Sequence, residues 1–146
     1  MKTITRLVRS TALLVTALML VPAAAADDDR TFFYNITTDQ TWRAGMAIGQ
    51  GTKALEAGYD VVLFLNVRGV RLAATAGNQD VFGPSGKTPR QMLETAADEG
   101  ARIVMCPMCM ERAGLEMGDL IGEAERGGPD VTFELMADDD TVVMSY

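Results

Sequence analysis

Apolar positions along the chain follow two patterns, short apolar or β-rich runs and longer stretches with apolar residues at helical spacing. The short runs predict strands, and a continuous run is typical of a parallel strand buried on both faces. They are Thr31–Ile36, Val61–Leu65, Arg102–Met105 and Thr141–Tyr146. Helical spacing predicts one helix over Thr41–Ala57. A second helix is expected to run from Thr88, as its N-cap, to about Glu99.

The chain after the third strand is less regular. Two short helices are expected there, from Pro107 to about Met117 and from Asp119 to Arg126. Residues 131–136 stay open between two structures, because their apolar residues alternate as in a strand while Pro129 is suited to begin a helix. Alternation of strands and helices predicts an α/β sandwich with a mainly parallel sheet.

The first 26 residues read as a signal peptide. Three basic residues precede the apolar run Thr11–Val21, and small residues up to Ala26 form a cleavage site. The apolar run is shorter than the roughly 20 residues that span a bilayer, so the alternative of an uncleaved anchor is less favoured. We therefore expect residues 27–146 to form a single domain that is periplasmic or secreted, with no membrane contact after cleavage.

Composition excludes several classes of function. The formal net charge is −7, and removing the three basic residues of the leader lowers it to −10. An acidic surface argues against nucleic acid and anionic membranes as partners. The chain has no histidine, which excludes Ser-His and Cys-His catalysis and histidine-ligated metal sites. Thiol chemistry is the main option that is left.

The two cysteines of the chain, Cys106 and Cys109, form a C-P-M-C motif directly after the third predicted strand. Chemistry in parallel sheets gathers at the carboxyl ends of the strands, and the start of the following helix would stabilise a Cys106 thiolate. Cys109 lies one helical turn on, close enough to attack an oxidised or persulfidated Cys106. Arg68, Arg71 and Arg112 are expected to assist if the segment after the second strand lies alongside.

Two other interpretations of the motif stay open. The cysteines can be a structural pair, although a disulfide across so small a loop stabilises little. Nearby methionine sulfurs and the two thiols would also suit Cu(I), but methionines at helical spacing more often fill a core. These methionines are Met105, Met108, Met110 and Met117. We expect no resident metal and no cofactor.

Several segments together resemble the DsrE/DsrF-like family, over about residues 31–146. They are Phe64–Ala73, Cys106–Cys109, Gly118–Gly122 and Val142–Tyr146. The resemblance implies a three-layer α/β/α sandwich with a mostly parallel five-stranded sheet, often assembled into trimers or hexamers. It also implies sulfur relay through a cysteine that lies eight residues before the glycine of the following helix. Gly114 then assigns the carrier role to Cys106 and leaves Cys109 as a resolving thiol or second carrier.

We therefore predict an exported, sulfurtransferase-like sulfur carrier that holds a persulfide on Cys106. Its expected partners are protein thiols or small polysulfides that donate or accept sulfur, together with further copies of the chain. One alternative is a thiol–disulfide oxidoreductase that uses the same cysteine pair. Another is a non-enzymatic oligomeric binding protein whose cysteines are structural or bind Cu(I).

Overall fold

The computed structural model describes residues 30–77 and 79–146, and the signal peptide predicted for residues 1–26 lies outside them. Within the described residues, five strands form one sheet in the order β4-β3-β2-β1-β5, and every pair is parallel. The strands are β1 (Thr31–Ile36), β2 (Asp60–Leu65), β3 (Arg102–Met105), β4 (Ala124–Arg126) and β5 (Thr141–Ser145). The predicted parallel, five-stranded sheet is thus confirmed.

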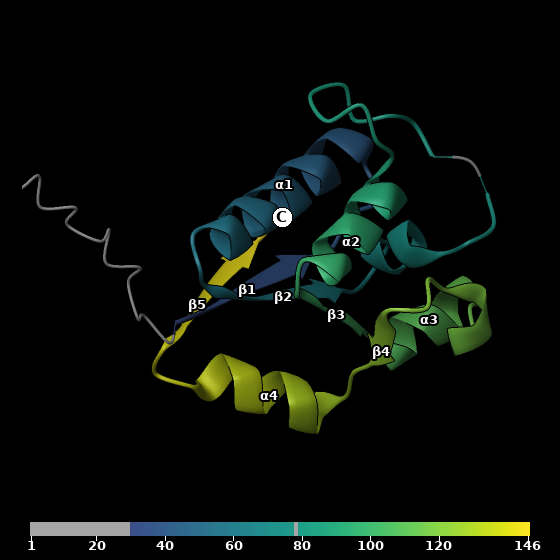
Figure 1. Ribbon diagram of the computed structural model, residues 1–146. Helices are drawn as coiled ribbons and strands as arrows, with labels where there is room; N and C mark the ends of the chain where they lie inside the picture. The colour runs from purple at the N-terminus through teal and green to yellow at the C-terminus, as the bar shows by residue number, and fades with distance from the viewer. Residues whose placement is uncertain (1–29, 78) are drawn as a thin grey trace, which may run out of the picture.

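Helices cover both faces of the sheet (Figure 1). They are α1 (Thr41–Glu56), α2 (Pro89–Asp98), α3 (Pro107–Ala113) and α4 (Pro129–Ala137), with short 3-10 segments η1 (Gly69–Ala73) and η2 (Met117–Asp119). Helices α1 and α2 lie on one face and α4 lies on the other, which confirms the three-layer α/β/α arrangement. None of the helices in residues 30–77 and 79–146 is long and apolar enough to cross a membrane.

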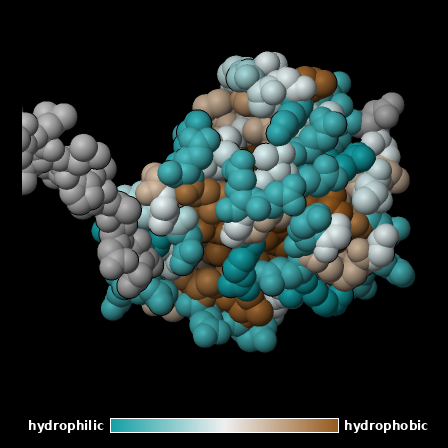
Figure 2. All heavy atoms as spheres, viewed as in Figure 1, coloured by the Kyte–Doolittle hydropathy of each residue, from teal (hydrophilic) through white to brown (hydrophobic). Residues whose placement is uncertain are grey.

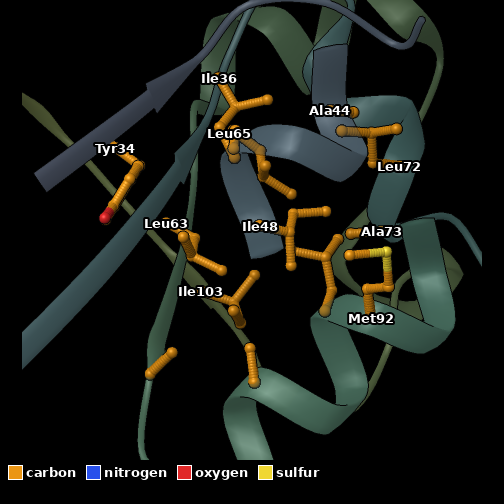
Figure 3. Packing of buried hydrophobic residues seen from close by; sticks show 14 of the residues in the cluster. Tyr34, Ile36, Ala44, Ile48, Leu63, Leu65, Leu72, Ala73, Met92 and Ile103 are labelled. Atoms are coloured by element: carbon orange, nitrogen blue, oxygen red, sulfur yellow. The ribbon is translucent and has the colours of Figure 1, made fainter. Parts of the chain in front are cut away.

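The core has two parts because successive side chains of a strand point to opposite faces. The larger part lies between the sheet and the layer of α1 and α2, where Ile48, Leu63 and Ile103 are fully buried (Figure 3). The smaller part lies under α4 and contains Val62 and Val104. Burial on both faces explains why β2 and β3 read as continuous apolar runs.

Most of the surface shown in Figure 2 is hydrophilic, as the charge content predicts. Hydrophobic residues show between the polar ones over the sheet and α4. Phe133 of α4 is 65% exposed and Val143 of β5 is 46% exposed.

The prediction of a helix over Asp119–Arg126 was wrong. The structure has η2 followed by strand β4 there, which pairs with β3 at the edge of the sheet. Pairing with a preformed neighbour overrides local helix preference in so short a segment. The helix that begins at Pro107 also ends earlier than expected, at Ala113, because Gly114 adopts a left-handed conformation with φ of 70°.

The structure also decides two local features, the conformation of residues 131–136 and the N-cap of α2. The ambiguous residues 131–136 belong to α4, which begins at Pro129, so the fifth strand of the sheet is β4 and not this segment. The expected N-cap of α2 is confirmed. Thr88 Oγ1 accepts a hydrogen bond from the Gln91 amide at 3.3 Å, and Gln91 Oε1 accepts one from the Thr88 amide at 2.9 Å.

Candidate functional site

The cysteine motif occupies the junction between β3 and α3, at the carboxyl edge of the sheet. Cys106 directly follows β3, and its amide donates to the carbonyl of Leu65 at the end of β2 at 2.9 Å. Its own carbonyl accepts from the Met110 amide at 3.0 Å, so its main chain joins the strand to the helix. The Cys106 side chain makes no capping hydrogen bond. Both cysteines are free thiols.

The segment after β2 is held beside this junction by the end of β1. The Asn66 amide donates to the Ile36 carbonyl and the Arg68 amide donates to the Thr37 carbonyl, each at 3.1 Å. Gly69 then passes so close to Ile36 that a Cβ at this position would overlap the Ile36 carbonyl oxygen. Only glycine allows this approach without a shift of the backbone, and the approach brings the arginines of the segment toward α3.

Val67 is an unexpected member of the site. Its φ of 47° lies in the left-handed region, which a β-branched residue rarely adopts, although its side chain is 60% exposed. The main-chain amide of Val67 interacts with the thiol of Cys109. Strained backbone of this kind is concentrated at functional sites. No feature of the sequence indicates it, because a valine in a loop carries no signal for a positive φ.

The two thiols interact with each other. Burial raises the pKa of the Cys109 thiol, and hydrogen bonding with Cys106 raises that pKa further. The main-chain amide of Val67 acts in the opposite direction and does not reverse the shift. Cys109 therefore keeps its proton to a higher pH than an ordinary thiol.

A cleft of about 790 Å³ opens beside Cys109. We call it the cationic cleft, and it is lined by Val67, Arg68, Arg71, Met108, Cys109, Arg112 and Ala113. The structure thus brings together the three arginines named from the sequence, and it brings them to Cys109. Arg68 is held by Asp39, with its Nε 3.0 Å from Oδ1. Cys106 does not line this cleft.

Cys106 lines a different and smaller cavity of about 250 Å³ on the α4 side. We call this cavity the apolar hollow, and its other lining residues are Phe64, Pro107, Met108, Gly128, Pro129, Thr132 and Phe133. Charged side chains are absent from this lining. The two thiols therefore interact with each other, but Cys109 lines the cationic cleft and Cys106 lines the apolar hollow. Met108 borders both cavities.

The four methionines considered as Cu(I) ligands lie in different surroundings, and Met117 is partly buried against the core. Met105 and Met110 are buried in the core, which fits a packing role, while Met108 is 80% exposed. In the described part of the chain, no group of three or more cysteine and carboxylate side chains is arranged to hold a metal ion.

The fold of the chain is shared with solved structures. The structure is similar to the crystal structure of the ychN protein from E. coli, with a TM-score of 0.68 and 16% identity, over 81% of this chain and 99% of that one. It is also similar to MTH1491, a protein of unknown function from Methanobacterium thermoautotrophicum, with a TM-score of 0.63 and 12% identity over 81% of this chain and 100% of that one. These likenesses establish the shared fold.

The sequence comparisons agree with the structural ones. A search of curated protein sequences finds no match. The model of the DsrE/DsrF-like family, by contrast, matches residues 11–144, which is nearly the whole chain. We conclude that the chain belongs to the DsrE/DsrF-like family.

Proposed function

We propose that the protein is a sulfur carrier that holds a sulfane sulfur on Cys106 and exchanges it with Cys109. The observation that carries the proposal is the placement of two interacting free thiols at the carboxyl end of β3, in a fold of the sulfur-relay type. Parallel α/β sheets concentrate their chemistry at this edge. The family position of Cys106, eight residues before Gly114, supports it as the holding residue.

Loading consists of one displacement at sulfur. The Cys106 thiolate attacks the terminal sulfur of a persulfide R–S–SH, and a new S–S bond forms as the S–S bond of the donor breaks. The donor leaves as the thiolate R–S⁻, and the protein holds Cys106–S–SH. No net oxidation takes place, so the cycle requires no external oxidant and no cofactor.

The state of Cys109 supports this division of roles. Cys109 is hydrogen-bonded with Cys106, so its sulfur lies within reach of a sulfane sulfur held on Cys106. Cys109 can then take the sulfur from Cys106 by the same displacement, or return it. The phenyl ring of Phe133 and the exposed Met108 border Cys106 with apolar surface, which suits contact with a protein that donates or accepts sulfur.

Intact mass spectrometry after treatment with inorganic polysulfide tests the proposal. We expect wild-type protein to gain the mass of one sulfur, and we expect Cys109→Ser to retain that gain. Cys106→Ser is expected to lose it, and its circular dichroism and thermal unfolding serve as the control for folding. Alkylation before proteolysis then locates the added sulfur on the peptide that contains the motif.

The same experiment separates the alternatives. A loss of two hydrogens without sulfur uptake would show a disulfide between the cysteines, and it would favour thiol–disulfide oxidoreduction or a structural pair. Equal sulfur uptake by Cys106→Ser and wild type would contradict the assignment of Cys106 as the holding residue.

A further inference from the structure

The cationic cleft is lined by positive charge, although the chain as a whole is acidic. The protein has 20 acidic and 13 basic residues, yet three of the seven residues that line this cleft are arginines and none is a carboxylate. A concave site lined by one sign of charge focuses the field and concentrates ligands of the opposite sign. The thiol of Cys109 lies inside this field, so the ligand that meets Cys109 is expected to be an anion.

The three arginines of the cationic cleft differ in whether they form ion pairs within the protein. Arg68 is paired with Asp39, which holds it in place and offsets its charge. In residues 30–77 and 79–146, neither Arg71 nor Arg112 forms an ion pair with a protein carboxylate. Guanidinium groups bind carboxylates through paired hydrogen bonds of defined geometry. Arg71 and Arg112 are thus the groups with capacity to bind an incoming carboxylate.

The size and the rest of the lining indicate an organic ligand. About 790 Å³ falls in the range of small-molecule sites and far exceeds what a bare inorganic anion occupies. Val67, Met108 and Ala113 provide apolar atoms between the arginines and the thiol. The apolar hollow at Cys106 is about 250 Å³ and its lining has no charged side chain, so it offers nothing to a carboxylate.

We infer that the cationic cleft binds a carboxylated, low-molecular-weight persulfide and delivers its sulfur to Cys109. This inference rests on the proposed carrier function and adds to it one class of donor that loads through Cys109, while other donors load Cys106 directly. Arg71 and Arg112 bind the carboxylate, and the apolar lining contacts the carbon chain. The persulfide group then lies against the sulfur of Cys109.

The transfer balances without a further reactant. The Cys109 sulfur attacks the terminal sulfur of R–S–SH, the S–S bond of the donor breaks, and the proton of Cys109 ends on the departing sulfur. The products are Cys109–S–SH and R–SH. In a second displacement, the Cys106 sulfur attacks the terminal sulfur on Cys109, the S–S bond at Cys109 breaks, and the proton of Cys106 passes to the Cys109 sulfur. The persulfide then resides on Cys106.

The test compares two donors that share a reactive group and differ in charge. They are the persulfides of 3-mercaptopropionate and of 2-mercaptoethanol, with inorganic polysulfide as a third donor that has no carboxylate. Sulfur loading is followed by intact mass spectrometry at low and high salt. For wild type we expect the carboxylated donor to load faster by about tenfold at low ionic strength, and salt to reduce that preference.

The variants assign the preference to the cleft. The double variant Arg71→Gln/Arg112→Gln is expected to load from both persulfides at similar rates. Both side chains are exposed, so folding is expected to be unaffected. Arg102→Gln, which removes an exposed arginine that pairs with Glu125, is the matched control and should keep the preference. Cys109→Ser should lose rapid loading from the carboxylated persulfide.

These outcomes distinguish the inference about the donor from the carrier function on which it rests. Equal rates for the two persulfides in wild type, with normal loading from polysulfide, would overturn the donor class and leave the carrier function standing. A preference that persists in the double arginine variant would overturn the role of the cleft. Failure of all three donors to load wild-type protein would overturn both proposals.

Discussion

The left-handed conformation of Val67 predicts that replacing this residue will stabilise the protein. The perturbation is Val67→Asn, because asparagine tolerates the left-handed region far better than a β-branched side chain. The substitution keeps the main-chain amide that interacts with Cys109. It therefore releases backbone strain without removing the contact with the thiol.

The size of the effect follows from two opposing terms. A side chain held in the left-handed region costs about 1–2 kcal/mol. Val67 is 60% exposed, so replacing its partly buried side chain by a polar one loses only about 0.5–1 kcal/mol of apolar burial. The expected net result is a stabilisation of about 0.5–1 kcal/mol.

Val81 provides a matched control. It is 57% exposed, nearly the same as Val67, and it does not have a positive φ. Val81→Asn is therefore expected to lose the burial term alone and to destabilise by about 0.5–1 kcal/mol. Urea denaturation of the two variants and wild type measures both values. The difference between the variants, about 1–2 kcal/mol, isolates the strain.

One result would refute this reasoning. If Val67→Asn and Val81→Asn destabilise the protein equally, the left-handed conformation of Val67 stores no strain. Val67→Ile is a further check, since it keeps the β-branch and should leave stability nearly unchanged.

Three further predictions concern the packing, capping and titration of named residues. Gly69→Ala is expected to destabilise by about 1–3 kcal/mol in urea, because its Cβ would overlap the Ile36 carbonyl, whereas Gly118→Ala, which has open space, should not. Thr88→Ala removes the N-cap of α2 and is expected to cost about 1 kcal/mol in thermal unfolding; an unchanged midpoint would argue against the capping box. Because the pKa of Cys109 is higher in the folded than in the unfolded protein, the folded state loses stability as pH rises from the ordinary thiol range through the raised pKa of Cys109. Urea titrations at increasing pH should therefore show a decline that Cys109→Ser reduces, and an identical decline in the variant would contradict the shift.

Much of the fold follows from local sequence. The runs that form β1, β2 and β3 are apolar because both faces of the sheet are covered. Strand β4 escaped prediction because Ala124–Arg126 is short and polar at one end, and it becomes a strand only by pairing with β3. In α4 the start signal at Pro129 was present, and the alternation of apolar residues after it competed with that signal.

The site was predictable in part. Its position after β3 followed from the C-P-M-C motif. The arginines were expected to assist the cysteines if the segment after β2 lay alongside them. The sequence also held a signal that Arg112 accompanies Cys109, because residues three apart share one face of a helix, whereas Cys106 precedes α3. The separation of the two thiols between different cavities depends on packing across the sheet and has no local signature.

The sheet order has a consequence for how the chain folds. Strand β1 lies between β2 and β5, and its contacts with β5 join residues 110 positions apart, as between Asn35 and Ser145. Pairings between such distant segments form late, because loop-closure entropy opposes them until the rest of the sheet is in place. During that interval one edge of β1 has unpaired amides and carbonyls that another chain can bind. The arrival of β5 therefore ends the period in which the protein is most exposed to aggregation.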